Sequence, residues 1–187
     1  LGKYLMQETW RQAVHFLVGT AIALSVAVFP EVWTVPFYAT SLLAGSIVID
    51  AIERGIRLPI VSPLLDLLER ENSEPGRGAY YFVVAALGCL LLFDSGQAGT
   101  SIFVLALLDS VTTVAGQRFG RHRIYNRKTL EGSLAGFIIA TGTLFAFLPP
   151  SSAFIAAGAG AIAELVSPVD DNLVVPPVVC LALVLAG

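Results

Sequence analysis

The sequence has little charge. Asp, Glu, Lys and Arg make up only 13% of its 187 residues, whereas about 25% is typical of a soluble globular domain. Hydrophobic residues account for 56% of the chain, and its mean hydropathy is +0.78. This composition argues against a water-soluble domain and indicates that lipid surrounds most of the chain.

Cysteine is also scarce. Cys89 and Cys180 are the two cysteines, and each lies within an apolar run. A disulfide framework and a cysteine-based zinc site are therefore excluded, and we expect both thiols to be packing residues. The net charge of −3 and the separation of the basic residues into clusters give no reason to expect nucleic acid as a partner. No signal-peptide pattern precedes the first apolar stretch, which we expect to be retained.

Seven apolar stretches approach the length needed to cross a bilayer. A hydrocarbon core of about 30 Å requires roughly 20 helical residues, with a tolerated range near 17 to 25. The stretches cover residues 13–29, 32–52, 79–93, 98–116, 132–148, 152–166 and 173–187. The third is short, and aromatic residues and Asp94 at its ends fit the two membrane interfaces. The sequence therefore predicts an all-α, polytopic transmembrane bundle of about seven spans, forming a single integral membrane domain over residues 1–187.

Basic residues occur only in alternate connections. Two precede the first stretch, four lie between the second and third, and five lie between the fourth and fifth: Lys3 and Arg11; Arg54, Arg57, Arg70 and Arg77; Arg118, Arg121, Arg123, Arg127 and Lys128. The other connections have none. The positive-inside rule therefore predicts a cytoplasmic amino terminus and cytoplasmic basic segments, with the carboxyl end outside.

The longest connection contains a surface segment at about residues 58–77, in which apolar residues recur at helical spacing. It predicts a short amphipathic helix that begins near Pro63 and lies on the membrane surface. Packing of this helix against the protein's own cytoplasmic side is an equal alternative.

Ionisable residues inside spans are costly and usually mark function. Four qualify: His15, Asp50, Asp109 and Glu164. Asp50 is close enough to the end of its span to reach the interface. His15 shares a helix face with Arg11. Asp109 is followed on its face by small residues and then by the arginine run, so its carboxylate suits a divalent metal whose phosphate partner is held by guanidinium groups. The alternative is an ion pair between Asp109 and an arginine of another helix.

Two further segments favour phosphate and metal chemistry. The sequence after Lys128 resembles an anion site at a helix start, with Thr129 as the N-cap and Gly132 and Ser133 in the first turn. The sixth stretch ends with oxygen ligands suited to a hard cation: Glu164, Asp170, Asp171 and Asn172. A turn rich in Pro and Asp would have a similar sequence.

Taken in order, these segments resemble the CTP-dependent polyprenol kinases, the family of dolichol kinase, phytol kinase and CTP-dependent diacylglycerol kinase, which is distantly related to CDP-lipid cytidylyltransferases. The resemblance covers nearly the whole chain. It rests on residues 11–19, 109–120, 128–133 and 163–173. The family usually has a Lys after the Arg of the first motif, whereas this chain has Gln12.

The resemblance implies phosphorylation of the hydroxyl of a membrane isoprenoid alcohol of the dolichol, phytol or geranylgeraniol type by CTP, with Mg²⁺ or another divalent cation. The resemblance implies that Arg11, Asp109, Gly116, Lys128 and Glu131 serve CTP and metal binding. Together with the patterns above, the predicted catalytic residues are Asp109, with His15 or Glu131 as base. The predicted CTP-binding residues are Arg11, Gly116, Arg118, Gly120, Arg121, Arg123, Lys128, Thr129, Gly132 and Ser133. The predicted metal ligands are Asp109, Glu164, Asp170, Asp171 and Asn172. The active site would lie at the cytoplasmic face.

Three alternatives remain at this point. Diacylglycerol could be the acceptor, or the protein could be a cytidylyltransferase that joins CMP to a lipid phosphate. A transporter with buried carboxylates is a third class. The clustering of polar residues at one face, with no polar path across the membrane, argues against transport. The sequence does not indicate an oligomeric state.

The charge pattern generates a topological prediction. A cysteine placed at residue 124 should react with a membrane-impermeant thiol reagent only from the cytoplasmic side, because it lies in the most basic connection. A cysteine at residue 97 should react only from the outside. Labelling of intact and permeabilised vesicles measures both, and labelling of both positions from one side would overturn the span count.

Overall fold

The computed structural model describes residues 2–68, 74, 76–124 and 128–186, and this part of the chain is almost entirely helical. Its elements are α1 (Gly2–Val28), α2 (Glu31–Glu53), α3 (Val61–Leu68), α4 (Arg77–Leu92), α5 (Ser95–Phe119), α6 (Leu130–Leu144), α7 (Pro150–Val166) and α8 (Asp171–Ala186). The described residues contain no β-strand, and their one β-bridge joins Arg123 to Thr129. The prediction of an all-α fold is confirmed.

Each of the seven predicted stretches corresponds to one helix. Three helices are long and apolar enough to cross a membrane, over Glu8–Val28, Glu31–Glu53 and Ser95–Phe119. The helices α4, α6, α7 and α8 are apolar but shorter, with 10–17 residues each. The amphipathic segment contains α3, which begins at Val61, two residues before the predicted start. Residues 69–73 and 75 of that segment lie outside the described part.

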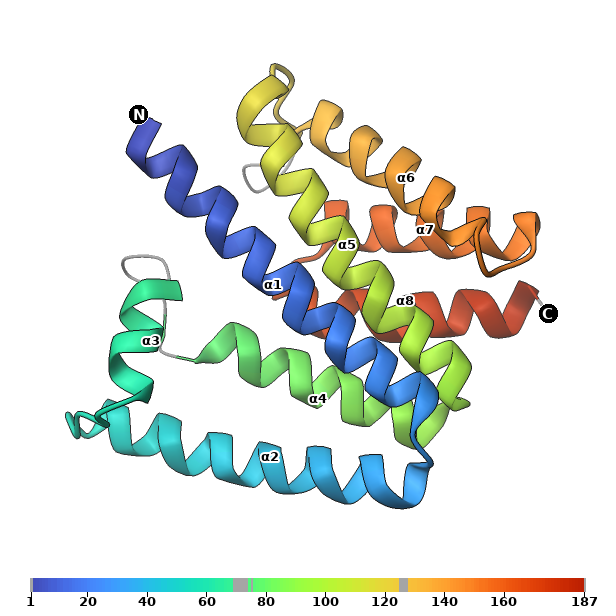
Figure 1. Cartoon of the computed structure of the whole chain (residues 1–187). Helices are drawn as coiled ribbons and strands as arrows, with labels where there is room; N and C mark the ends of the chain where they lie inside the picture. Colours follow the sequence, from blue (N-terminus) through green and yellow to red (C-terminus); the bar gives the residue numbers. More distant parts are fainter. Residues whose placement is uncertain (1, 69–73, 75, 125–127, 187) are drawn as a thin grey trace.

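The long helices run alternately between the two ends of the bundle (Figure 1). The amino terminus, the connection that contains α3, the α5–α6 loop and the α7–α8 turn lie towards one end. The opposite end has short turns, which proline and capping explain. Pro30 and Pro149 precede the starts of α2 and α7, and the Asp94 carboxylate accepts a hydrogen bond from the Gln97 N–H at 3.0 Å at the start of α5. The described parts of the basic segments lie at the end of the bundle opposite to these short turns.

Helix α5 forms the centre of the bundle. It packs against α1, α6, α7 and α8, and α4 packs against α2 and α8. In its most apolar window 61% of α5 is buried, compared with 6% for α2. The side chains of Ile102, Leu105 and Leu108 are fully covered. The part of α5 that carries these side chains is therefore held by several neighbouring helices.

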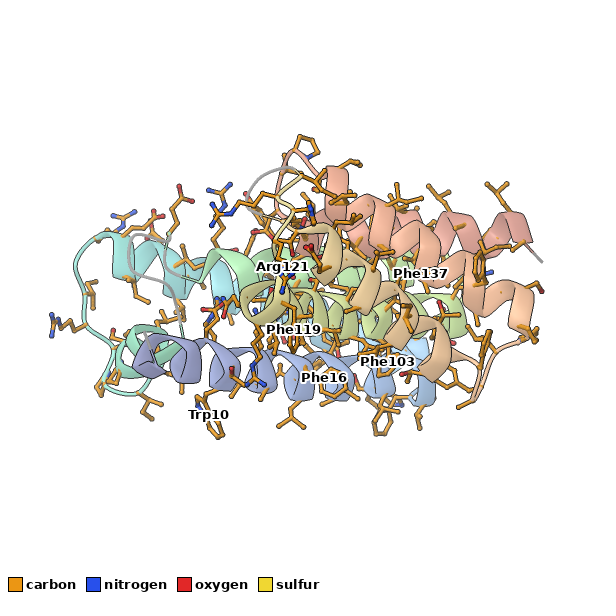
Figure 2. The ribbon with its side chains drawn as sticks, turned by 90° about the horizontal axis from the view of Figure 1, so that it is seen from above. Trp10, Phe16, Phe103, Phe119, Arg121 and Phe137 are labelled. Atoms are coloured by element: carbon orange, nitrogen blue, oxygen red, sulfur yellow. The ribbon has the colours of Figure 1, made fainter. Side chains whose placement is uncertain are left out.

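The outer surface of the bundle is apolar. Large exposed side chains include Trp33 and Phe37 on α2, Ile138 on α6 and Leu185 on α8. Trp10 points away from the bundle in Figure 2, and 61% of its surface is exposed. Extended apolar patches of this kind are rare on soluble monomers. They fit contact with lipid, which is the solvent of the outer surface of a transmembrane helical bundle.

Glycines let α5 and α6 approach closely. A Cβ at Gly132 would lie 2.6 Å from the carbonyl oxygen of Thr112, and a Cβ at Gly136 would lie 2.4 Å from the Thr112 Cγ2. Neither distance is compatible with a side chain. The crossing of α5 and α6 therefore depends on the absence of side chains at these two positions.

This crossing generates a stability prediction. Gly136→Ala should destabilise the protein by about 1 to 3 kcal/mol, because Thr112 is β-branched and cannot move away without shifting a helix. Gly142→Ala is the matched control on the same helix. Its Cβ would meet nothing within 4 Å, so it should be neutral or stabilising by up to about 1 kcal/mol. Thermal unfolding in detergent measures both variants, and equal midpoints would contradict the packing argument.

Candidate functional site

Six of the predicted site residues line one cavity of about 700 Å³ at the end of the bundle that holds the basic segments. They come from α1, α5 and the start of α8 with the turn before it: Arg11, His15, Asp109, Asp170, Asp171 and Asn172. These segments are far apart in the sequence, so the cavity depends on the tertiary fold. The structure thus brings together six of the side chains that the sequence marks as candidates for catalysis, CTP binding or metal binding.

His15 and Asp109 face each other across the α1–α5 contact. His15 Nε2 lies 3.5 Å from Asp109 Oδ2. The helices approach closely because a Cβ at Gly19, one turn after His15, would lie only 2.5 Å from the Ala106 Cβ. Phe82 of α4 contacts the imidazole in a T-shaped arrangement, with ring centroids 5.6 Å apart. His15 Nε2 is buried and has no hydrogen-bond partner among the described residues, so it is available to a bound molecule.

The turn before α8 supplies the second group of carboxylates. The Asn172 N–H donates to Asp170 Oδ1 at 3.0 Å, and the Asn172 side chain donates to the Gly78 carbonyl at 3.2 Å. The second bond ties the start of α8 to the start of α4. Burial raises the pKa of Asp170, and the nearby negative charge of Asp109 raises it further. Asp170 and Asp109 line the same cavity.

Lys128 contacts the end of α7 and the start of α8 beside this turn. Its ammonium group donates to the Glu164 carbonyl oxygen at 2.5 Å, to Glu164 Oε1 at 3.3 Å and to Asp171 Oδ2 at 2.6 Å. Thr112 of α5 donates to Glu164 Oε1 at 2.6 Å. An ammonium group has three hydrogens, and all three have protein acceptors here. The structure therefore gives Lys128 a role in holding carboxylates, beside the predicted one of binding phosphate.

The predicted anion site at the start of α6 is organised around Thr129. Its side chain accepts from the Gly132 N–H at 3.2 Å, so the prediction of an N-cap is confirmed. The site's glycines have a packing role, because a Cβ at Gly116, Gly120 or Gly132 would lie within 3.0 Å of a Thr129 side-chain atom. The Ser133 N–H donates to the Thr129 carbonyl at 3.0 Å. These residues shape the α5–α6 contact and do not line the cavity.

The basic loop lies beside the cavity and not in its wall. Arg118, Arg121 and Arg123 are exposed, and Arg127 lies outside the described residues. Glu131 binds this loop: its carboxylate accepts from the Arg121 N–H at 3.0 Å and lies 2.6 Å from His122 Nδ1. The structure therefore places the two candidate bases differently, with His15 at the cavity and Glu131 in the loop.

Sequence reasoning did not place Arg77 at the cavity. Arg77, at the start of α4, lines the cavity, is ion-paired to Glu74 at 2.8 Å and lies over the Tyr81 ring at 5.2 Å. Arg11 is likewise ion-paired to Glu8. Nothing in the sequence separates Arg77 from the other arginines that obey the positive-inside rule. Only the position of α4 reveals it.

The carboxylate oxygens that line the cavity suit magnesium better than a metal ion whose ligands all come from the protein. No group of three or more His, Cys, Asp or Glu side chains in the described residues is arranged to hold a metal ion. Magnesium usually takes one or two protein carboxylates and completes its shell with water and substrate phosphate. Asp109 and Asp170 line the cavity and meet that requirement. Carboxylates also outnumber basic side chains in its wall, which favours a bound cation.

The chain is similar to a protein of Methanocaldococcus jannaschii named "Uncharacterized protein MJ1137". The two are 38% identical over 179 residues, which cover 93% of this chain and 91% of that protein. No protein-family model matches the chain, and no solved structure matches it. The relative's name gives no activity, so the chemistry of the cavity has to carry the functional argument.

The Lys128 cluster generates a prediction. Lys128→Met should destabilise the protein by up to about 3 kcal/mol, because it leaves Glu164, which is 3% exposed, without its counter-charge. Adding Glu164→Gln should recover part of that loss by removing the buried charge. Arg121→Met, at an exposed position, is the control and should be neutral within about 0.5 kcal/mol. Unfolding midpoints of the wild type, the Lys128→Met and Glu164→Gln single variants, the double variant and the control measure the coupling, and additive effects of the two cluster substitutions would contradict it.

Proposed function

This chain belongs to the same family as the Methanocaldococcus jannaschii protein, and we propose that it is a CTP-dependent lipid kinase. It transfers the γ-phosphoryl group of CTP to the hydroxyl of a membrane isoprenoid alcohol, giving a lipid monophosphate and CDP. The observation that carries the proposal is the meeting of His15, Asp109 and Asp170 at the polar side of a cavity whose other walls are apolar. Such a cavity suits a substrate with a reactive polar head and a long apolar chain.

In this proposal α1, α2 and the five further apolar helices of the chain form seven membrane spans. The amino terminus, the α5–α6 loop and the cavity lie at the cytoplasmic face. The support is that every basic segment lies at the end of the bundle where the cavity lies, which the positive-inside rule assigns to the cytoplasm. CTP is then on the side from which the polar end of the cavity can be reached.

The reaction needs positioning and neutralisation of charge more than covalent help from the protein. The alcohol oxygen attacks the γ-phosphorus, and the bond from that phosphorus to the oxygen bridging to the β-phosphate breaks. The electron pair of that bond leaves with CDP. Asp109 and Asp170 are the residues that would hold Mg²⁺, which neutralises phosphate charge when bound.

The hydroxyl proton needs an acceptor, and His15 is favoured over Glu131. His15 lines the cavity and has a buried ring nitrogen without a partner. Glu131 is engaged by His122 and by two loop N–H groups. Asp109 lies beside the imidazole, with its Oδ2 3.5 Å from His15 Nε2. A base must reach the proton that it abstracts, and only His15 of the two candidates is at the cavity.

The arginines divide into two groups in the proposed mechanism. Arg11 and Arg77 line the cavity and are the candidates for direct contact with phosphate. Arg118, Arg121 and Arg123 are exposed beside it and attract the triphosphate from solution by their charge. Because the hydrogens of Lys128 already have acceptors, its contribution is to hold Asp171 and Glu164.

The central prediction concerns Asp109. Asp109→Asn keeps the side-chain volume but removes the charge, so phosphoryl transfer should fall by about 10²- to 10³-fold while the protein stays folded. Asp50→Asn is the control, because Asp50 is 59% exposed and paired with Arg54 away from the cavity. The assay uses γ-labelled CTP, a panel of lipid alcohols and thin-layer chromatography.

Three results would contradict the proposal. If Asp109→Asn kept normal turnover at limiting Mg²⁺, the carboxylate would have no metal-binding role. If label from α-labelled CTP but not from γ-labelled CTP appeared on the lipid, the protein would be a cytidylyltransferase. Net flux of a solute in proteoliposomes without nucleotide turnover would instead indicate a transporter.

A further inference from the structure

The apolar side of the cavity is built by side chains that the predicted chemistry does not involve. Its walls come from α1, α3 and α4: Val14, Val18 and Ile22; Leu64 and Leu65; Phe82 and Val83. We refer to these seven residues as the acceptor slot. His15 and Asp109 line the same cavity, so the slot and the polar groups are parts of one space.

The slot exists because α1 and α4 have different packing partners. α1 packs mainly on α5, whereas α4 packs on α2 and α8, and α1 and α4 do not form a closely packed pair. Phe82 bridges them where its ring contacts His15, and its Cζ would lie 3.3 Å from a Cβ at Gly19. α3 contributes the remaining wall. Val18 and Leu64 are each 53% exposed, so the slot reaches the outer surface of the bundle.

We infer that the slot binds the hydrocarbon chain of a lipid alcohol that enters sideways between α1 and α4, with its hydroxyl beside His15 and Asp109. The identity of this occupant as an alcohol rests on the proposed kinase function. Its apolar chain rests on the slot itself, because seven apolar side chains continue from the exposed apolar surface to a polar end. Phe82 lies where the two parts meet and sets how far the chain can advance.

The size of the cavity favours a single chain over two. A volume of about 700 Å³ holds on the order of twenty groups at roughly 30 Å³ each, the volume of a water molecule in the liquid. One isoprenoid chain of that size fits, and a longer one continues into the bilayer through the open side. Two chains of the same length lying side by side inside the cavity would need about twice that volume. We therefore expect the slot to favour a single-chain alcohol over diacylglycerol.

A photoactivatable probe tests the slot without catalysis. A single-chain prenyl alcohol carrying a diazirine is added to the full-length protein in detergent micelles without nucleotide, and crosslinked peptides are identified by mass spectrometry. Crosslinks should fall on α1 and α4 within the slot. Unlabelled single-chain alcohol should compete with the probe, and diacylglycerol should not. Crosslinks spread over the outward face of α2 would overturn the slot, and equal competition by diacylglycerol would overturn the single-chain selectivity.

Substitutions give a second, quantitative test. Val18→Trp should fill part of the slot and lower crosslinking, and raise KM for the alcohol, by about tenfold, with the affinity for CTP unchanged. Leu17→Trp is the matched control, because Leu17 is the adjacent residue, is 66% exposed and does not line the cavity. Val18→Ala should retain crosslinking, which separates blockage from loss of the native side chain. Equal crosslinking in the two tryptophan variants would overturn the slot.

The two proposals fail in different ways. Crosslinking in the slot without phosphate transfer from CTP would remove the kinase function and leave a binding site for a single-chain lipid. Phosphate transfer to the alcohol with the same KM in Val18→Trp and Leu17→Trp would keep the kinase function and remove the slot.

Discussion

The close packing of α5 against its neighbours is the constraint on which the rest of the structure depends. On one side Gly19 lets α1 approach Ala106, and on another Gly136 lets α6 approach Thr112. Each contact is made without intervening side chains, so the rotation of α5 is fixed. Asp109 consequently faces His15, and Thr112 reaches Glu164. A small shift of this one helix would separate both pairs at once.

The cluster of Lys128, Glu164 and Asp171 shows how such a bundle holds charged groups. Removing charges from water costs several kcal/mol per ion, and pairing them often only offsets that cost. The cluster is therefore better explained by geometry than by stability. It joins the α5–α6 loop to the end of α7 and the start of α8, and it positions the turn that carries Asp170. A neutral cluster could pack equally well but would not align carboxylates towards the cavity.

Much of the fold could be predicted from the sequence because apolar length and basic residues are strong local signals. They located the three long apolar helices and the four shorter ones of the described residues, and they grouped the connections correctly at two ends. The grouping of His15, Asp109 and Asp170 could be predicted because the order of the apolar stretches assigns all three to the same side of the membrane. The acceptors of the Lys128 ammonium group and the position of Arg77 at the cavity could not be predicted, because a side chain's neighbours depend on how helices rotate and cross. The acceptor slot could not be predicted either, because it exists only where α1 and α4 do not pack closely against each other.

The proposed reaction takes place between a nucleotide that is dissolved in water and an alcohol that is dissolved in the membrane. In the proposal the two molecules reach the cavity by separate routes. The exposed arginines of the α5–α6 loop lie on the aqueous route, whereas the acceptor slot opens on the apolar surface. Between the two routes the cavity wall has more carboxylates than basic groups. A bare triphosphate would be repelled there, and a triphosphate that carries a divalent cation would be attracted. In the proposed mechanism the carboxylates would thus make the metal a condition of nucleotide binding, and the fixed position of His15 on α1 would then decide which hydroxyl can react.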